Sequence, residues 1–204
     1  MKMKKIAVFL DRDGVVNEEV NLLTKPEQIK LIDGVAEGIK LLNKNEILTI
    51  IVTNQPVVAR NLITEEQLKR INEELLNQLK KRGAHIDALY YCPHHPEKNH
   101  LEANNLRYRK ECECRKPKTG MIKKATKRFK INTNDSYVIG DQTVDIQLGK
   151  NAGCKTILVE TGYGGRDNKY DVVADYYCKK LLNACNMIIK LTKGAKNDNL
   201  TNSL

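Results

Sequence analysis

Aromatic residues are scarce in this sequence of 204 residues, which has no tryptophan and only 2 phenylalanines. Hydrophobic residues nevertheless make up 41% of it, so we expect an aliphatic core that is large enough for one folded domain. Long apolar runs are absent as well. None approaches the ~20 residues that cross a bilayer, which excludes a transmembrane helix. The apolar run 6–10 is too short for a secretory signal and ends on carboxylates, so we predict a cytoplasmic protein.

Disulfide bonds are not expected, although the sequence has 6 cysteines. The sequence shows no export signal, and the chain is long enough to fold without covalent crosslinks. Cys154, Cys178 and Cys185 lie in apolar or helical contexts, and we interpret them as ordinary buried or half-buried thiols. The other three cysteines lie close to histidines and therefore indicate a metal site.

Short β-rich runs alternate with amphipathic stretches, which predicts an α/β fold with a doubly wound, Rossmann-like parallel sheet. The runs are continuously apolar, as expected of strands that are covered on both faces. The expected strands are 5–10, 47–52, 87–91, 136–139 and 155–159, with a weak sixth at 172–174. The expected helices are 34–45, 64–82 with a capping box from Thr64 to Gln67, 119–130, 143–152 and 175–193. We predict a single domain over 1–193 and a disordered tail over 194–204.

Polar residues follow three of the expected strands where these end. Asp11 and Asp13 follow the first strand, residues 53–55 follow the second, and Asp141 follows the fourth. Because ligands of doubly wound sheets bind beyond the carboxyl ends of the strands, we expect these side chains to meet. Buried carboxylates are costly unless they bind something, and Mg²⁺ prefers carboxylate and phosphate oxygens. The pattern therefore predicts a magnesium site at Asp11, Asp13 and Asp141.

A carboxylate that attacks a phosphate needs cations nearby, because the two anions repel each other. Mg²⁺ and Lys116 would supply this positive charge, and the hydroxyl of Thr53 would donate to a phosphoryl oxygen. We predict that Asp11 attacks phosphorus to form an aspartyl-phosphate. Asp13 would protonate the leaving oxygen and then deprotonate the attacking water. A lone Asp-x-Asp is usually structural; the combination, each part at a strand end, indicates a phosphatase.

The segments CPHH (92–95) and CEC (112–114) supply three thiols and a histidine pair. Three thiolates and one imidazole make a closed tetrahedral zinc site, which is structural because no position is left for water. Zinc would order a long loop beside the active site. The alternative is a set of free thiols beside a coincidental pair of histidines. The spacing does not distinguish His94 from His95, whereas His85 and His100 are expected at the surface.

The motifs DRDGV (11–15), TN (53–54), RKP (115–117) and GDxxxD (140–145) resemble, in this order, those of the haloacid dehalogenase-like phosphatases. The resemblance implies that Asp11 is the nucleophile and Asp13 the acid/base. It also implies that Thr53 and Lys116 stabilise the phosphoryl group. Mg²⁺ would lie on Asp11, the backbone carbonyl of Asp13 and Asp141, with Asp145 in a supporting role.

The Cys/His loop narrows the resemblance. The segments DRDGVVNEE (11–19), TNQPVVAR (53–60), CPHHPE (92–97) and CxCRKPKTGM (112–121) are similar to the D-glycero-D-manno-heptose 1,7-bisphosphate 7-phosphatases. Histidinol-phosphate phosphatases are their relatives and share the zinc loop. The resemblance implies hydrolysis of the 7-phosphate in the biosynthesis of nucleotide-activated heptose, with histidinol phosphate as the alternative substrate. It also favours His94 as the fourth zinc ligand, with Cys92, Cys112 and Cys114.

The gaps between the motifs leave no room for a cap domain, since 39 residues separate Asp13 from Thr53 and 60 separate Thr53 from Cys114. Small loops would therefore shape the site, which suits a compact sugar bisphosphate. The residues expected to bind this substrate are Arg12, Glu19, Asn21, Asn54, Gln55, Arg115 and Gln142.

Several positions depart from the heptose enzymes and leave the sugar and its anomer open. Asn21-Leu22 replaces Gly-Tyr, Pro56-Val57 replaces Ser-Gly, Asn61 replaces Gly, and Gln142 replaces Lys.

The formal net charge is +10, and residues 107–130 hold eleven Lys or Arg against two Glu. Such a stretch attracts anions, among them the second phosphate of a sugar bisphosphate. A zinc-stabilised nucleic-acid-binding module is the non-enzyme alternative, but Tyr108 and Phe129 alone form a thin stacking platform. We predict a small-molecule substrate, no nucleic acid, no membrane and a monomer.

Overall fold

The computed structural model describes residues 5–96 and 104–201, the last eight of these by their backbone only. A parallel six-stranded sheet runs through the molecule in the order β3-β2-β1-β4-β5-β6. This confirms the α/β fold class, and five of the six strands lie where the sequence placed them. The strands are β1 (Ala7–Leu10), β2 (Leu48–Asn54), β3 (Ala88–Cys92), β4 (Tyr137–Gly140), β5 (Lys155–Val159) and β6 (Tyr176–Cys178).

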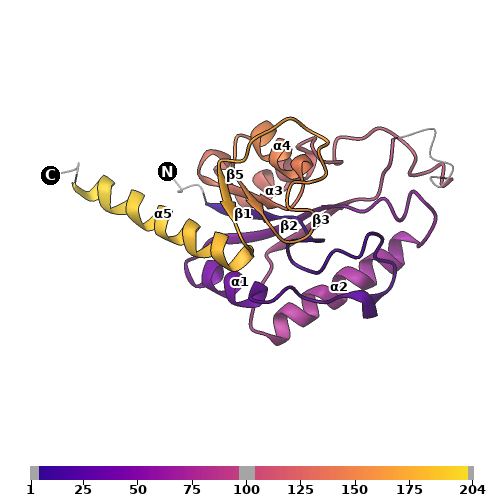
Figure 1. Ribbon diagram of the computed structural model, residues 1–204, viewed down its shortest axis with the longest axis horizontal. Coiled ribbons are helices and arrows are strands. Elements are labelled where there is room, and N and C mark those ends of the chain that lie inside the picture. Colours follow the sequence, from indigo (N-terminus) through magenta and orange to yellow (C-terminus); the bar gives the residue numbers. More distant parts are fainter. Residues whose placement is uncertain (1–4, 97–103, 202–204) are drawn as a thin grey trace.

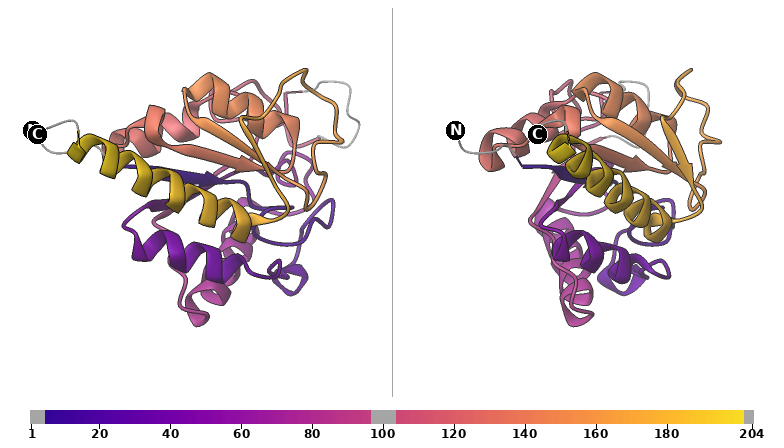
Figure 2. Two further views of the ribbon diagram at one scale, coloured as in Figure 1. Left: turned by 60° about the vertical axis from the view of Figure 1, so that its left-hand side comes forward. Right: turned by 90° about the vertical axis from the view of Figure 1, so that its left-hand side faces the viewer.

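Helices cover both faces of the sheet (Figures 1 and 2). One face carries α1 (Val35–Lys44), α2 (Glu65–Lys81) and α5 (Leu181–Thr201), and the other carries α3 (Gly120–Phe129) and α4 (Thr143–Ala152). Two short 3₁₀ helices, Pro26–Gln28 and Thr133–Asp135, lie in the connections. Thr64 caps α2 in the expected capping box, since its hydroxyl accepts from the backbone N–H of Gln67.

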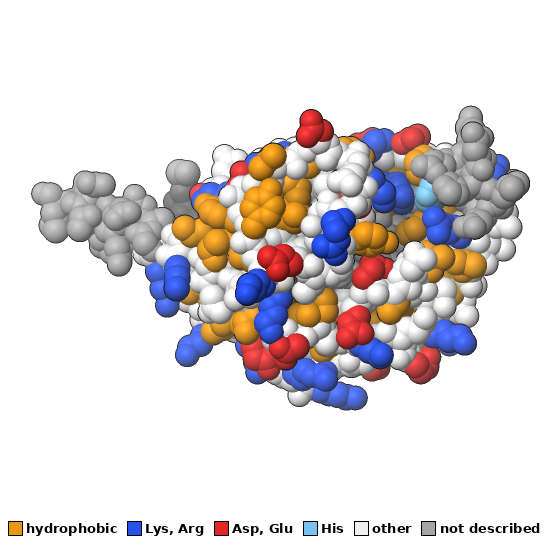
Figure 3. All heavy atoms as spheres, viewed as in Figure 1, with side chains coloured by type: hydrophobic (Ala, Val, Ile, Leu, Met, Phe, Trp, Pro, Cys, Tyr) orange, Lys and Arg blue, Asp and Glu red, His pale blue; other side chains and the backbone are white. Residues whose placement is uncertain are grey.

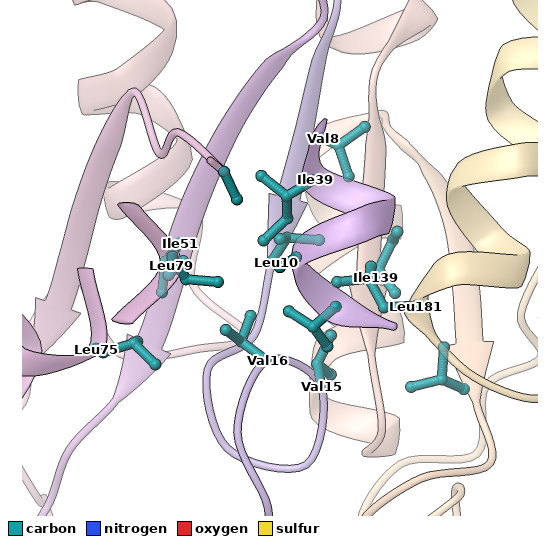
Figure 4. Packing of buried hydrophobic residues seen from close by; sticks show 14 of the residues in the cluster. Val8, Leu10, Val15, Val16, Ile39, Ile51, Leu75, Leu79, Ile139 and Leu181 are labelled. Atoms are coloured by element: carbon teal, nitrogen blue, oxygen red, sulfur yellow. The ribbon is translucent and has the colours of Figure 1, made fainter. Parts of the chain in front are cut away.

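The core is aliphatic and divided by the sheet. Successive residues of β1 point to opposite faces, so Val8 and Leu10 join one buried cluster while Ala7 and Phe9 join the other. Figure 4 shows Leu10 together with Ile39 of α1 and Ile139 of β4 in the first cluster. Burial on both faces explains why the strands read as continuous apolar runs.

The end of the chain differs from the expectation in two places. The sixth strand is Tyr176–Cys178, because the carboxylate of Asp175 accepts from the backbone N–H of Thr156 and strand pairing begins only after it. The last helix begins at Leu181 and continues to Thr201, beyond the end predicted for it at 193. Residues 194–201 contain no proline to stop the helix. Among the described residues, no helix has both the length and the apolar character needed to cross a membrane.

Candidate active site

Three carboxylates and one lysine meet beyond the carboxyl ends of β1 and β4. The ammonium of Lys116 lies 2.8 Å from Asp11 Oδ1 and 2.6 Å from Asp145 Oδ1. All three side chains are almost completely buried. Burial disfavours the charge on Lys116, but the two carboxylates outweigh it and raise its pKa. Lys116 is therefore a permanent cation at this site.

Asp141 completes the cluster, and carboxylate oxygens of Asp11, Asp141 and Asp145 all lie within 4.8 Å of one another. Asp141 Oδ2 accepts from the backbone N–H of Tyr163 at 2.8 Å, whereas the buried Oδ1 has no hydrogen-bond partner. Burial, with the charges of Asp11 and Asp145, raises the pKa of Asp141. The pKa of Asp145 is also raised, by burial first, although Lys116 opposes this.

Two glycines form the cradle around Asp141. A Cβ built on Gly14 would lie 2.3 Å from Asp141 Oδ2, and one built on Gly162 would lie 2.2 Å from the same atom. Both glycines have positive φ, at +77° and +61°. The hydroxyl of Thr161 donates to the carbonyl of Gly14 at 2.6 Å and so joins the two loops. The backbone can therefore approach this carboxylate only because neither position carries a side chain.

The charge of the cluster fits a divalent cation. Three carboxylates face a single ammonium, and one buried carboxylate oxygen is left without a donor. Oxygen ligands at a site of net negative charge are what Mg²⁺ prefers in proteins. Asp11 and Asp141 are the carboxylates available to it, since Asp145 Oδ1 is bonded to Lys116 and its Oδ2 accepts from the backbone N–H of Gln142.

Asp13 is not part of this carboxylate cluster. Its carboxylate accepts from Arg12 Nε at 3.1 Å and Nη2 at 2.9 Å, from Asn17 at 2.9 Å and from Gln55 at 2.7 Å. Burial acts to raise the pKa of Asp13, but Arg12 and the other donors outweigh it, and the pKa is lowered. A magnesium contact of Asp13 would therefore fall to its backbone.

Arg12 does not occupy the position predicted for it. We expected a substrate contact, yet this side chain is 0% exposed and lies outside the residues that line the cavity described below. Its guanidinium binds Asp13 and donates to Asn72 of α2 at 2.9 Å. The structure therefore places Arg12 behind Asp13, where it holds that carboxylate in position.

A cavity of ≈ 520 Å³ opens over the carboxylate cluster. The loops that follow the first five strands all contribute to its wall. It is lined by ten of the predicted site residues: Asp11, Asp13, Glu19, Asn21, Thr53, Asn54, Gln55, Arg115, Lys116 and Gln142. The departures at Leu22, Pro56 and Val57 also face it. A volume of this size is within the range of small-molecule sites.

Two of these residues position their neighbours. The side chain of Asn54 accepts from the backbone N–H of Lys116 at 2.9 Å and donates to its carbonyl at 3.3 Å. Gln55 donates to both Thr53 Oγ1 at 2.9 Å and Asp13 Oδ2 at 2.7 Å. The last residue of β2 thus holds the backbone of Lys116, and the residue after it holds the carboxylate of Asp13.

Cys92, His94, Cys112 and Cys114 form a second cluster at the end of β3. Its sulfur–sulfur distances are 3.2–3.5 Å, and His94 Nδ1 lies 3.4 Å from the sulfur of Cys114 and 3.7 Å from that of Cys92. A tetrahedron with metal–sulfur bonds of about 2.3 Å has edges of about 3.8 Å, so the four atoms fit one zinc ion closely. The structure also resolves the choice between neighbours, because His95 instead lines the cavity.

The Cys/His cluster is joined to the active site through Arg115. Its guanidinium donates to the carbonyl of His94 at 2.9 Å, and it directly follows Cys114 in sequence. Ordering of the cluster therefore fixes the backbone that carries Lys116. The remaining cysteines behave as expected, with Cys154 and Cys185 buried and Cys178 half-buried, all as free thiols.

The basic stretch 107–130 contributes little to the cavity. Within the described residues only Arg115 and Lys116 of this stretch line it. On the face shown in Figure 3, basic and acidic side chains are interspersed. Because Lys116 is held by Asp11 and Asp145, Arg115 is the one described residue of this stretch in the cavity wall that remains for a second phosphate.

Sequence motifs did not indicate the loop between β5 and β6. It supplies Tyr163, Lys169 and Tyr170 to the cavity wall, and its backbone holds Asp141. Its only signal was the Gly-rich segment TGYGG (161–165), which follows a strand as the other site segments do.

The fold and the site define a class: a haloacid dehalogenase-like hydrolase with a Rossmann-like α/β fold. A HAD-hydrolase-like family model matches residues 113–184. The D-glycero-beta-D-manno-heptose-1,7-bisphosphate 7-phosphatase of Pasteurella multocida is 40% identical over 161 residues, which are 78% of this chain and 84% of that protein. The D-glycero-alpha-D-manno-heptose-1,7-bisphosphate 7-phosphatase of Photorhabdus laumondii is 38% identical over 165 residues, 80% of this chain and 87% of that protein.

A solved structure agrees with these relatives. The D,D-heptose 1,7-bisphosphate phosphatase of B. bronchiseptica, complexed with magnesium and phosphate, has a TM-score of 0.78 and 28% identity. The match covers 92% of this chain and 99% of that chain. The chain therefore belongs to the haloacid dehalogenase-like phosphatases, in the family of the heptose 1,7-bisphosphate 7-phosphatases.

Proposed function

We propose that this protein hydrolyses the 7-phosphate of D-glycero-D-manno-heptose 1,7-bisphosphate in the biosynthesis of nucleotide-activated heptose. The observation that supports it most directly is the position of Lys116 between Asp11 and Asp145, beneath a cavity whose wall includes Arg115 and the Cys/His loop. The identity of the sugar is inferred from the names of the relatives. Because relatives of both anomer types are almost equally similar, the proposal does not extend to the anomer.

In the first step an oxygen of Asp11 attacks phosphorus and forms an aspartyl-phosphate, while the bond from phosphorus to the sugar oxygen breaks. Lys116 and Thr53 stabilise the phosphoryl oxygens. Asp13 gives a proton to the leaving sugar oxygen. Since the donors around Asp13 keep it a carboxylate in this structure, it must take up that proton with the substrate bound.

In the second step Asp13 removes a proton from water, which attacks the aspartyl-phosphate, releases phosphate and restores Asp11. We assign Mg²⁺ to Asp11, Asp141 and the backbone carbonyl of Asp13, where it would neutralise charge on the phosphate. We assign Zn²⁺ to the Cys/His cluster as a structural ion. Glu19, Asn21 and Gln142 remain proposed substrate contacts. A single domain, a monomeric state, a cytoplasmic location and the absence of nucleic-acid or membrane partners likewise remain proposals.

A comparison of substrates tests the proposal. Phosphate release is measured with both anomers of the heptose bisphosphate and with histidinol phosphate, in the presence of Mg²⁺. The proposal predicts the larger kcat/KM for one of the heptose anomers. A larger kcat/KM for histidinol phosphate would contradict it.

A further inference from the structure

The cations that line the cavity come from loops on different sides of the nucleophile. Arg60 follows β2, and Arg115 and Lys116 follow β3, whereas Lys169 lies in the loop after β5. In the sheet order, β2 and β3 lie to one side of β1 while β4 and β5 lie to the other. Lys169 therefore comes from the opposite side of β1 to Arg60 and Arg115.

Under the proposed function, Lys116 and the nucleophile Asp11 receive the reacting phosphate. Lys116 is held by two carboxylates, one of which is the proposed nucleophile, and Arg115 is tied to the Cys/His loop beside it. Lys169 is exposed, and within the described part of the chain no carboxylate lies within ion-pair distance of its ammonium. Its charge is therefore available to a ligand in the cavity.

The loop that carries Lys169 is fixed to the site. The carboxylate of Asp167 accepts from both the backbone N–H and the hydroxyl of Thr143 at 2.7 Å, directly after Gln142 in the cavity wall. The backbone N–H of Tyr170 donates to the same hydroxyl at 3.1 Å, and that of Gly165 donates to the carbonyl of Asp141 at 2.7 Å. Lys169 thus lies between two anchored residues, so its backbone position is set even though its side chain is exposed.

We propose that Lys169 binds the second, anomeric phosphate of the substrate and selects bisphosphates over monophosphates. The inference rests on the proposed function, because it assumes a sugar with a phosphate at each end. Strands two places apart in a sheet are separated by roughly 10 Å, which is comparable to the length of such a sugar. A phosphate held at Asp11 would leave its partner phosphate near the loop after β5.

The test compares Lys169→Gln, Lys169→Arg and the wild type on heptose 1,7-bisphosphate and on the same heptose with the 7-phosphate alone. Loss of one charged hydrogen bond is expected to lower kcat/KM for the bisphosphate about tenfold. The loss should appear mainly in KM, with the monophosphate unaffected. Lys169→Arg keeps the charge and should retain most of the preference. Lys80→Gln removes the same charge on the exposed side of α2 and should leave kcat/KM unchanged for both substrates.

If Lys169→Gln lowered kcat/KM equally for both substrates, or for neither, the role of Lys169 would be overturned while the proposed function remained intact. A wild type that does not hydrolyse the heptose bisphosphate would instead contradict the proposed function. In that case the same ratio is measured with a hexose bisphosphate and its monophosphate. A preference that Lys169→Gln removes supports the inference there, and a preference that persists overturns it.

Discussion

The guanidinium of Arg12 donates hydrogen bonds to both carboxylate oxygens of Asp13, from Nε to Oδ1 at 3.1 Å and from Nη2 to Oδ2 at 2.9 Å. Such forked pairs fix orientation as well as charge. On its far side the same guanidinium donates to Asn72, so α2 supports the residue that we assign as acid/base. Arg12 is therefore part of the frame of the site.

Replacement of Arg12 by methionine should destabilise the protein. It leaves the Asp13 carboxylate without its main partner and Asn72 without a donor, and breaking a buried ion pair costs about 3 kcal/mol. Urea unfolding measures the loss. Arg70→Met is the control, because the Arg70–Glu66 pair is exposed and contributes at most about 1 kcal/mol. Unchanged stability combined with weaker substrate binding would restore the original prediction that Arg12 contacts the substrate.

Gly14→Ala should weaken the response to Mg²⁺. The added methyl group would meet Asp141 Oδ2 at 2.3 Å and displace a carboxylate that we assign to the metal. Gly83→Ala is a matched control, since Gly83 has nearly the same φ, +76° against +77°, and its nearest neighbouring atom is the flexible end of Lys40 at 3.5 Å.

Both glycine variants should lose about 1–2 kcal/mol of stability through backbone strain. Only Gly14→Ala should require a higher Mg²⁺ concentration for half-maximal activity, by at least about tenfold. The same Mg²⁺ dependence in both variants would argue against Asp141 as a ligand.

Elemental analysis should find about one zinc ion per chain, held by the Cys/His cluster. Cys114→Ser removes one thiolate and should release it, with a fall in stability and in activity because the backbone of Arg115 and Lys116 is no longer held. Cys178→Ser is the control, since that thiol is outside the cluster and should leave the zinc content unchanged. A fully active, zinc-free protein would refute the assignment.

Much of the fold could be predicted because its signals are local. Continuous apolar runs marked β1 to β5, and the Thr64 capping box marked the start of α2. The sixth strand could not be placed, because its start depends on a hydrogen bond between Asp175 and Thr156 that only the folded chain forms. The end of the last helix was predicted too early, at 193, because the residues that follow are polar. Residues 194–201 contain no proline that would stop the helix.

In the site, too, local sequence signals predicted some features, while others depend on the folded chain. Asp11, Thr53 and Asp141 could be brought together from their places at strand ends, since parallel strands end at one edge. The direction of a side chain could not be inferred in this way, as Arg12 shows: a charged residue between two site aspartates turns into the core. Lys169 and Tyr163 were missed because they lie in a loop with no motif of its own, well after the last recognisable segment.

The central claim is that Asp11 transfers the 7-phosphate of the heptose bisphosphate. Phosphorus NMR of the reaction with Mg²⁺ follows both phosphates of the substrate separately, for the wild type and for Asp11→Asn. The account predicts that the wild type removes the phosphate at C7 and accumulates the sugar 1-phosphate, while folded Asp11→Asn leaves both phosphates in place. Turnover by Asp11→Asn, or release of the anomeric phosphate first, would contradict it.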